Sequence, residues 1–231
     1  MGGILRVVSA NLWSGRAEPE AFAEQVQALR ADVVCVQELA PVQAEALAAV
    51  MPHGRLEPAQ RHHGMGIALR EPARIERIPL RYRDARAALL DPKDWAGLAA
   101  PLEIVNVHLA APVLWPYHRQ PAVRRAQLDG LFAHLDAAPR RRRAVLGDFN
   151  ATPAWPAYRR VARRLTDLVD AHARAQGDRP RRTWPHLPRM PWLRLLRIDH
   201  CFGQDVRLEE VEVMPVRGSD HCALRIDLAL D

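Results

Sequence analysis

The sequence predicts an α/β protein in which helices cover a mixed β-sheet. Apolar runs of strand length alternate with stretches of helical periodicity in the first half of the chain, and strand-like runs dominate its end. The 231 residues are enough to bury one large core, and no low-complexity linker divides them. We therefore expect a single domain over residues 1–231.

The strand-like segments show period-two alternation or a short, continuous apolar run. They lie at Leu5–Ala10, Val33–Gln37, Gly66–Leu69, Leu102–Leu109, Ala144–Gly147, Ile198–Phe202, Val206–Met214 and Cys222–Leu228. Helical spacing occurs at Glu20–Leu29, Val42–Met51, Val123–Leu135 and Tyr158–Ala171. Pro19 and Pro41 stand at the start of two of these helices, where proline is favoured because no helical partner needs its missing N–H. The segment Gln176–Arg197 has no periodicity and is too long for a plain connection, so we expect a functional loop there.

Two of the strands end alike. "VVSANLW" near the start and "AVLGDFN" in the middle are both apolar runs that finish in a polar triplet containing asparagine. This echo suggests two related halves, each of which offers a strand end to a shared cleft.

The charge of the chain favours an anionic partner. There are 33 basic and 27 acidic residues, a formal net charge of +6, and Lys93 is the one lysine among them. Arginine binds phosphate through two parallel hydrogen bonds, and a basic surface attracts polyanions. A GC-rich genome also produces arginine-rich chains, so the charge alone does not identify the partner.

The compartment is predicted from what the sequence lacks. No apolar run approaches the roughly 20 residues that span a bilayer, and the start "MGGILRVVSANLW" is too short and too soon polar for a secretory signal. Cys35 and Cys201 lie in strand-like runs, as expected for buried thiols in a reducing compartment. We therefore expect a cytoplasmic protein, with a monomer as the favoured state.

Polar side chains stand at the boundaries of many of these strands. They are Asn11, Glu38, His108, Asp148 with Asn150, Asp199 with His200, and Asp220 with His221. Any one of them has an ordinary explanation, and Gly-Asp-x-Asn in particular is typical of an Asx-type turn. So many acids are costly to bury unless a cation and mutual hydrogen bonds compensate. Carboxylates that hold Mg²⁺ and position a water fit the hydrolysis of a phosphoester.

Other chemistries lack their motifs. No Cys–His or Cys–Cys spacing indicates zinc, and no Gly-x-x-x-x-Gly-Lys loop indicates a nucleoside triphosphate site. The pair Gly64 and Gly66 is too short a glycine signal for a dinucleotide site.

Taken in chain order, the motifs resemble a known superfamily. "SANLW", "VVCVQEL", "VNVHL", "LGDFN", "RIDHCF" and "GSDHCAL", spread from Ile4 to Leu228, resemble the endonuclease/exonuclease/phosphatase superfamily. Its members include pancreatic-type deoxyribonuclease, apurinic/apyrimidinic endonucleases, bacterial sphingomyelinases and inositol-polyphosphate phosphatases. The resemblance implies a four-layer α/β/β/α sandwich with two stacked mixed β-sheets flanked by helices. It also implies one Mg²⁺, with Mn²⁺ as a possible substitute, at the cleft between the sheet ends.

The resemblance assigns a metal site. Glu38 matches the main metal-ligating glutamate of the family, with Asn11 beside it. Asp220 matches an acid near the metal.

It assigns catalytic residues as well. Asp148 matches the aspartate that orients or deprotonates the attacking water, and Asn150 matches the amide that holds this water or a phosphate oxygen. Asp199 matches the carboxylate partner of the final histidine, His221. His108 matches a histidine that contacts the phosphate or assists the leaving oxygen. A carboxylate next to His221 would also raise the pKa of that imidazole.

Some features depart from particular branches of the superfamily. The chain reads "QELAP" after its second strand, where exonuclease III-type enzymes read Gln-Glu-Thr-Lys, and it has His108 where they have tyrosine. The lysines of the inositol-polyphosphate phosphatases are missing. These differences argue against a dedicated abasic-site endonuclease and against an inositol-polyphosphate phosphatase.

Substrate contacts are predicted in the segment Thr183–Arg197. Here Trp184 and Trp192 are interleaved with Arg189 and Arg194, a composition that suits stacked bases with a phosphate backbone but also a lipid headgroup region. Arg119, after the His108 loop, is a further candidate for substrate binding. By contrast, the run Pro139–Arg143 and the pair His62–His63 are expected to be solvated surface.

The sequence thus predicts a Mg²⁺-dependent phosphodiesterase whose partner is nucleic acid, most simply a DNA endonuclease or exonuclease. The alternative activity is that of a phosphatase or a phospholipid or sphingolipid phosphodiesterase, which would make a lipid surface the partner. A catalytically silent phosphate-binding module is the competing hypothesis outside enzymes, and the complete polar set argues against it.

Overall fold

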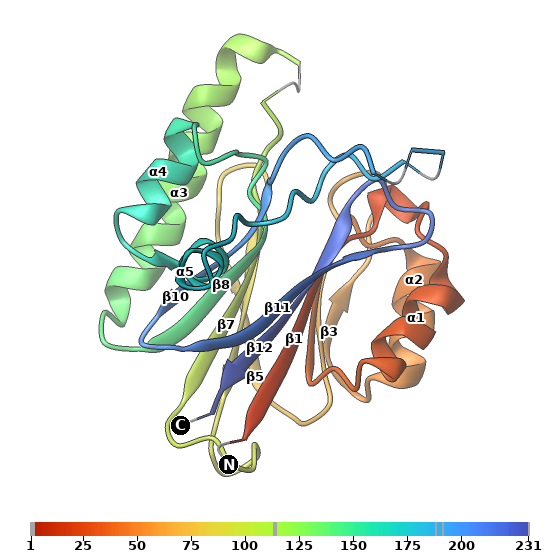
Figure 1. Cartoon of the computed structure of the whole chain (residues 1–231), viewed down its shortest axis with the longest axis vertical. Helices are drawn as coiled ribbons and strands as arrows, with labels where there is room; N and C mark the ends of the chain where they lie inside the picture. The colour runs from red at the N-terminus through yellow and green to blue at the C-terminus, as the bar shows by residue number, and fades with distance from the viewer. Residues whose placement is uncertain (1–2, 113–114, 188, 191, 231) are drawn as a thin grey trace.

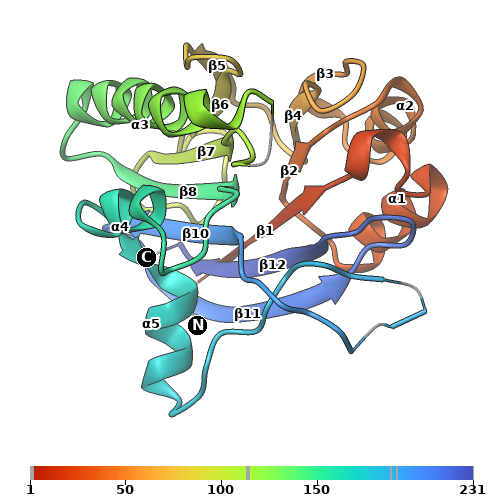
Figure 2. The same ribbon diagram turned by 90° about the horizontal axis from the view of Figure 1, so that it is seen from above.

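The fold is a four-layer α/β/β/α sandwich, as expected from the resemblance. The computed structural model describes residues 3–112, 115–187, 189–190 and 192–230. Two six-stranded mixed sheets pack face to face, and helices cover their outer faces (Figures 1 and 2). One apolar cluster, which includes Val7, Cys35, Ile104 and Leu146, fills the space between the sheets.

The first sheet contains both ends of the chain. Its strands, in spatial order, are β11 (Leu208–Pro215), β12 (Cys222–Ala229), β1 (Ile4–Asn11), β2 (Val33–Gln37), β4 (Met65–Leu69) and β3 (His53–Glu57). β1 and β2 run parallel, and the other neighbours in this sheet are antiparallel. Helices α1 (Pro19–Ala28) and α2 (Pro41–Val50) cover its outer face, packed through residues such as Phe22, Val26 and Leu47.

The second sheet repeats this arrangement. Its order is β5 (Arg74–Ile78), β6 (Ala85–Leu90), β7 (Leu102–His108), β8 (Arg142–Asp148), β10 (Asp199–Gln204) and β9 (Thr166–Asp167). β7 and β8 are parallel, and β10 runs antiparallel to β8, just as β12 runs antiparallel to β1. Helices α3 (Gln120–Ala137) and α4 (Pro156–Ala162) cover the outer face, with α5 (Leu168–Ala175) at the β9–β10 edge.

This topology brings the polar strand ends together. The carboxyl ends of β1, β2, β7 and β8 lie at the same end of the molecule, where β10 and β12 begin. In the register, His108 pairs with Asp148, and Asp148 pairs with Asp199. Residues from distant parts of the chain therefore share one end of the sandwich.

The predicted helix Tyr158–Ala171 is wrong as a single element. The chain leaves α4 after Ala162, forms the short strand β9 and starts α5 at Leu168. Asp167 fixes the start of the second helix, because its carboxylate accepts a hydrogen bond from the N–H of Asp170 at 2.9 Å and caps α5. The strands β3, β5 and β6 were also not predicted, and the polar, partly exposed sequences of β3 and β5 explain their weak signals.

The run Pro139–Arg143 is not wholly the solvated surface that was expected. Arg143 lies in β8 and is fully buried, and its in-register neighbour on β7 is Glu103. The Nε of Arg143 lies 3.5 Å from Oε2 of Glu103. Position in the strand, and not the local charge run, decides where this guanidinium lies.

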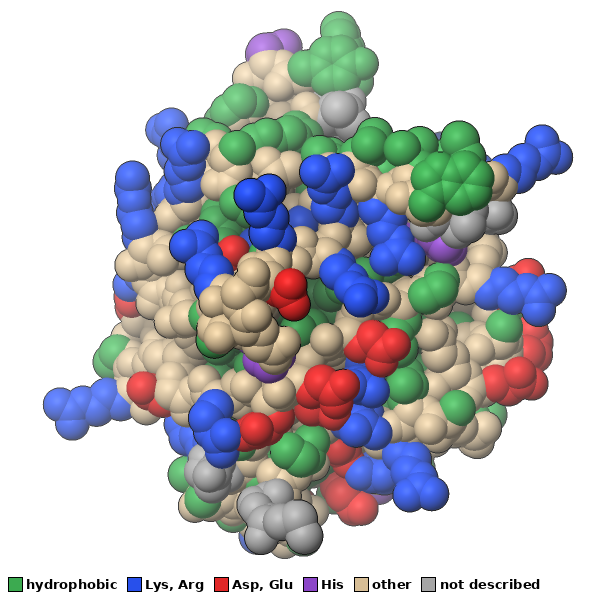
Figure 3. Space-filling model, in the orientation of Figure 1, with side chains coloured by type: hydrophobic (Ala, Val, Ile, Leu, Met, Phe, Trp, Pro, Cys, Tyr) green, Lys and Arg blue, Asp and Glu red, His purple; other side chains and the backbone are tan. Residues whose placement is uncertain are grey.

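The surface is basic on one face. Figure 3 shows lysine and arginine side chains gathered over the upper half of the view, where the segment between α5 and β10 crosses the strand ends. Hydrophobic side chains project from the two loops at the rim of the same end. The exposed large apolar residues include Trp115, Tyr117, Met190 and Trp192.

Candidate active site

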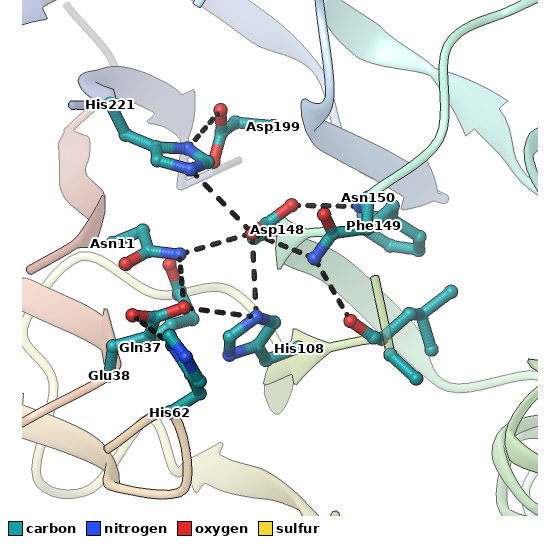
Figure 4. A network of polar contacts seen from close by, with 12 residues as sticks. Asn11, Gln37, Glu38, His62, His108, Asp148, Phe149, Asn150, Asp199 and His221 are labelled. Atoms are coloured by element: carbon teal, nitrogen blue, oxygen red, sulfur yellow. Dashed lines mark hydrogen bonds and ion pairs between the residues drawn. The ribbon is translucent and has the colours of Figure 1, made fainter. Parts of the chain in front are cut away.

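The polar side chains at the strand ends surround a cleft of about 330 Å³. Figure 4 shows them converging from both sheets, with Asp148 near the centre of the network. The first sheet contributes Asn11, Glu38 and His221, and the second contributes His108 and Asp148.

Glu38 follows β2 directly and is held by a turn. Its φ of +56° is the left-handed conformation, which is rare for a residue other than glycine. The carboxylate accepts hydrogen bonds from the Ser14 hydroxyl at 2.7 Å and from Asn11 Nδ2 at 3.4 Å. Nδ1 of His62 lies 2.9 Å from Oε2 of Glu38, so His62 belongs to the site although a solvated turn was expected there.

Asp148 and Asn150 form an Asx turn and, at the same time, part of the site. The N–H of Asn150 donates to Oδ1 of Asp148 at 2.8 Å, and the Asn150 side chain donates to Oδ2 at 3.1 Å. Asn11 Nδ2 donates to the same Oδ2 at 3.1 Å from the other sheet. The interpretation of Gly-Asp-x-Asn as an Asx turn is therefore correct. The same turn holds the carboxylate inside the cleft, and its functional role stays a prediction.

His221 and Asp199 form the expected carboxylate–imidazole pair. His221 Nδ1 lies 3.0 Å from Oδ2 of Asp199, and its Nε2 lies 3.9 Å from Oδ2 of Asp148. Burial opposes the charged imidazole, but the charge and hydrogen bond of Asp199, reinforced by Asp148 and Asp220, raise the pKa of His221 to about 10. His221 is thus a cation at neutral pH.

His108 lies between the carboxylates of Asp148 and Glu38 and, unlike His221, is uncharged. Its Nε2 is 3.4 Å from Asp148 Oδ2 and 3.8 Å from Glu38 Oε1. Burial, together with the nearby charge of Arg83, lowers the pKa of His108 well below its usual value. The imidazole is therefore neutral, and its buried Nδ1 has no hydrogen-bond partner within the described residues.

Burial also changes the pKa of Asp148, the acid at the centre of the network. Burial raises this pKa to about 7. The charge of His221 opposes the rise, and the charges of Asp199 and Glu38 add to it. A carboxylate that titrates near neutral pH can accept a proton from a weakly acidic group.

Arg83 lines the cleft and was missed by the sequence analysis. It is 5% exposed, its Nε has no partner in the described part of the chain, and Nη1 makes one long hydrogen bond of 3.5 Å to the carbonyl oxygen of His108. It lies in the turn before β6, in a local sequence with no strand-end pattern. Its guanidinium also lies over the ring of Tyr82, and the charges of Glu38 and Asp148 favour its cationic form.

Comparison with known proteins decides the family. The sequence profile described as the endonuclease/exonuclease/phosphatase family matches residues 8–221. The chain belongs to this family. A search of curated protein sequences finds no significant match.

Solved structures show the same fold at low sequence identity. A Bacteroides vulgatus member of the endonuclease/exonuclease/phosphatase family is 19% identical, covers 99% of this chain and 100% of its own, and has a TM-score of 0.75. D. rerio TDP2, solved with a single-strand DNA product, is 18% identical over 98% of this chain and 99% of its own, with a TM-score of 0.73. The catalytic domain of human Nocturnin with bound sulfate is 19% identical over 99% and 95%, with a TM-score of 0.70.

The family generally uses divalent metals, and the donor set of this cleft fits one. Asp148, Asp199 and His221 lie within 4.8 Å of one another and are buried. A protonated His221 has no lone pair for a metal ion, so the donors of this group are the two carboxylates. Among the described residues, Glu38 and Asp148 form ion pairs with histidines and with no lysine or arginine. Oxygen donors of this kind suit a hard divalent ion, and these residues alone do not fix its identity.

Asp220 and Trp184 are joined at the wall of the cleft. Trp184 Nε1 donates to Asp220 Oδ2 at 3.0 Å, and the buried Oδ1 of Asp220 has no partner among the described residues. Both residues line the cleft. Trp184 therefore orients an acid that is still able to accept a further ligand.

The other predicted substrate contacts lie outside the cleft. The residues that line it do not include Arg119, Arg189, Trp192 or Arg194. Arg119, Arg189 and Trp192 are exposed, and Arg194 is half-buried.

Arg197, the last residue of the same predicted segment, is buried. Its Nη1 donates to Oδ2 of Asp167 at 2.8 Å. It stabilises the β9 corner instead of facing a substrate. No helix in the described part of the chain is long and apolar enough to cross a membrane.

Proposed function

We propose that this protein is a metal-dependent phosphodiesterase that hydrolyses DNA by attack of water on phosphorus. The observation that carries the proposal is the convergence of two buried carboxylates, a cationic His221 and a neutral His108 on one cleft. Hydrolysis of a phosphodiester needs a group that positions the nucleophile and charges that stabilise the phosphate oxygens.

Glu38 is the proposed main metal ligand, with the Asn11 amide and the free oxygen of Asp220 as further donors. A bound Mg²⁺ or Mn²⁺ would supply positive charge to the phosphate and to the leaving oxygen. The left-handed turn at Glu38 and its bonds to Ser14 and His62 keep the carboxylate in place.

Asp148 is the proposed acceptor for the proton of the attacking water. Its pKa of about 7 suits a base that works at neutral pH. Asn150 holds this carboxylate through its backbone N–H and its Nδ2, which also donates to the carbonyl oxygen of Leu109. Its side-chain oxygen is the proposed acceptor of a hydrogen bond from the same water. These roles would account for an acid and an amide two residues apart at the end of β8.

His221 and Arg83 are the proposed cations for the phosphate oxygens. Asp199 orients His221 through Nδ1, which leaves Nε2 to face Asp148 and the cleft. His108 is proposed to contact the phosphate or the leaving oxygen, because its Nε2 faces both carboxylates.

DNA is proposed as the substrate because of the charge of the molecule. The net charge of +6 and the arginines gathered around the strand ends favour a polyanion with several phosphates. The exposed aromatic side chains at the rim suit unpaired bases. They would also suit a lipid surface, which keeps a phospholipid or sphingolipid phosphodiesterase as the second candidate.

A substrate panel tests the proposal. Pure protein with Mg²⁺ is incubated with plasmid, single-stranded DNA, abasic duplex and vesicles of sphingomyelin or phosphatidylcholine, and the released products are quantified. We expect DNA to be cleaved and the lipids to remain intact. Vesicle binding that survives high salt, with lipid hydrolysis and no DNA cleavage, would show that the second candidate is correct.

A further inference from the structure

A second pocket adjoins the cleft. It has a volume of about 380 Å³ and lies between the start of α3 and the start of α4. Pro112 and Trp155 line both spaces, so the pocket and the cleft share a wall. The two spaces are therefore neighbours, and a group bound in one lies next to a group bound in the other.

Gln120 is an unsatisfied polar residue in the wall of the pocket. It is 7% exposed, and its Oε1 has no hydrogen-bond partner within the described residues. A buried carboxamide normally pairs both its oxygen and its NH₂ group, and leaving it unpaired destabilises the fold. An unpaired amide oxygen in the wall of a pocket indicates that a ligand supplies the missing donor.

A second unpartnered group lines the same pocket. Arg160 donates from Nη2 to Oδ1 of Asp129 at 2.7 Å, but its Nη1 is buried and has no partner in the described part of the chain. The wall of the pocket therefore contains two buried polar atoms, Oε1 of Gln120 and Nη1 of Arg160, that have no partner within the described residues.

The remaining wall is aromatic and apolar. Two aromatic residues, Tyr117 and Trp155, line the pocket together with Pro121 and Leu128. Tyr117 is 59% exposed at the mouth, where its ring packs edge-to-face on Trp115 with the centroids 5.5 Å apart. A flat, heteroaromatic occupant matches rings together with a carboxamide.

We infer that this pocket binds an unpaired nucleobase of the substrate next to the scissile phosphate, and that Gln120 recognises its edge. The inference rests on the proposed function. Glutamine pairs with adjacent donor and acceptor atoms, and adenine offers N6–H beside N7. A base in a duplex is stacked and paired, so the substrate is single-stranded or splayed at this position.

The pocket is tied to the proposed catalytic residues. Arg124 lies in its wall and donates to the carbonyl oxygens of Ala110 and Phe149, the latter at 3.2 Å. These two carbonyls belong to the loops that follow β7 and β8, directly after His108 and Asp148. A base held in the pocket therefore fixes the position of the neighbouring phosphate.

Mononucleotide binding tests the pocket without any turnover. Calorimetry in EDTA compares AMP with ribose 5-phosphate, which has the phosphate and sugar but no base. We expect AMP to bind at least about fivefold more tightly, and Gln120→Leu to remove most of that advantage. Gln120→Leu should not lower the melting temperature, because it replaces an unpaired buried amide by an apolar group of similar size. Gln27→Leu on the exposed face of α1 is the matched control and should retain the advantage.

Equal affinity for the two ligands, or an unchanged preference in Gln120→Leu, would overturn the inference. Hydrolysis separates this failure from a failure of the proposed function. Wild type should cleave both a single-stranded oligonucleotide and bis-(p-nitrophenyl) phosphate, which has no base, and Gln120→Leu should slow only the first. If Gln120→Leu slows hydrolysis of the oligonucleotide and of bis-(p-nitrophenyl) phosphate equally, Gln120 has only a structural role. If the wild type cleaves neither substrate, the proposed function is wrong, and the AMP binding test still decides whether the pocket binds a base.

Discussion

The parallel strands β7 and β8 have a buried acid at each end, and the two acids are neutralised differently. At the start of the strands, Glu103 faces cations: Arg141 Nη1 lies 2.7 Å from Oε1, Arg143 Nε 3.5 Å from Oε2, and His134 Nε2 3.1 Å from Oε1. At the other end, Asp148 contacts His108, His221 and two asparagine side chains, but no described arginine.

The difference appears in the pKa values. Burial would raise the pKa of Glu103, but hydrogen bonds from His134 and Arg141 outweigh it and hold the pKa below its usual value. At Asp148 burial prevails, and its pKa rises to about 7. One strand pair thus has a permanently charged structural acid at one end and a titratable acid at the other. A buried charge that the protein does not fully neutralise is a signature of a functional site.

The largest predicted effect is a loss of turnover on substitution of Asp148, the titratable acid at the end of β8. Asp148→Asn should lower turnover of bis-(p-nitrophenyl) phosphate by at least about 100-fold, because the proton acceptor is lost while the shape is kept. Its melting temperature should stay the same or rise, since a buried acid is removed. Steady-state kinetics with Mg²⁺ and thermal unfolding measure both quantities. Turnover near the wild-type level would exclude Asp148 as the base.

Substitution of Glu103, the acid at the start of the two strands, should instead lower stability and leave turnover nearly unchanged. Glu103→Gln leaves Arg143 buried without its anion and should lower the free energy of unfolding by about 3 kcal/mol. Turnover of the folded variant should remain within a few-fold of wild type. Urea unfolding and steady-state kinetics on the same samples test these two expectations. A loss of turnover without a loss of stability would show that Glu103 is not a purely structural acid.

The pH dependence of this variant sharpens the comparison. Because the folded pKa of Glu103 lies below its unfolded value of 4.5, its stabilisation is complete above that pH and is lost as the pH falls through the folded pKa. The stability difference between wild type and Glu103→Gln should therefore be constant above about pH 5 and shrink in more acidic solution. A difference that grows on acidification would contradict the assignment.

Glu38→Gln should have a smaller effect that metal can reverse. The variant keeps its hydrogen-bonding shape but loses the charge of the proposed ligand, so about tenfold more Mg²⁺ should be needed for half-maximal turnover. A Mg²⁺ titration of wild type and variant measures the shift. Identical titration curves would show that Glu38 does not hold the metal.

The smallest effect, on DNA affinity, is expected for Arg189 and Arg194, which lie outside the cleft. Arg189→Gln combined with Arg194→Gln should weaken DNA binding only a few-fold and reduce its dependence on salt, because neither residue lines the cleft. Fluorescence anisotropy over a salt series, with Asp148→Asn as the non-cleaving background, tests this. An unchanged salt slope would place the DNA path elsewhere.

The sequence by itself determined the family, the sandwich class and the candidate set at the strand ends. Apolar runs of period two mark where strands stop, and the polar residue that follows each run has a position that local geometry fixes. Glu38, Asp148 and His221 can therefore be named from the sequence alone. Their proximity agrees with the prediction, and their chemical roles stay predictions until they are tested.

Only the tertiary structure decided which of many similar side chains reach the cleft. Arg83 is one arginine in a chain full of them, and its burial depends on the packing of the turn before β6 beneath His108. His62 contacts Glu38 because the β3–β4 connection returns across the end of β2. Gln120 is left unpaired by the way α3 packs beside α4. Such contacts join residues far apart in the chain, so no local pattern encodes them, whereas the strand ends are encoded locally.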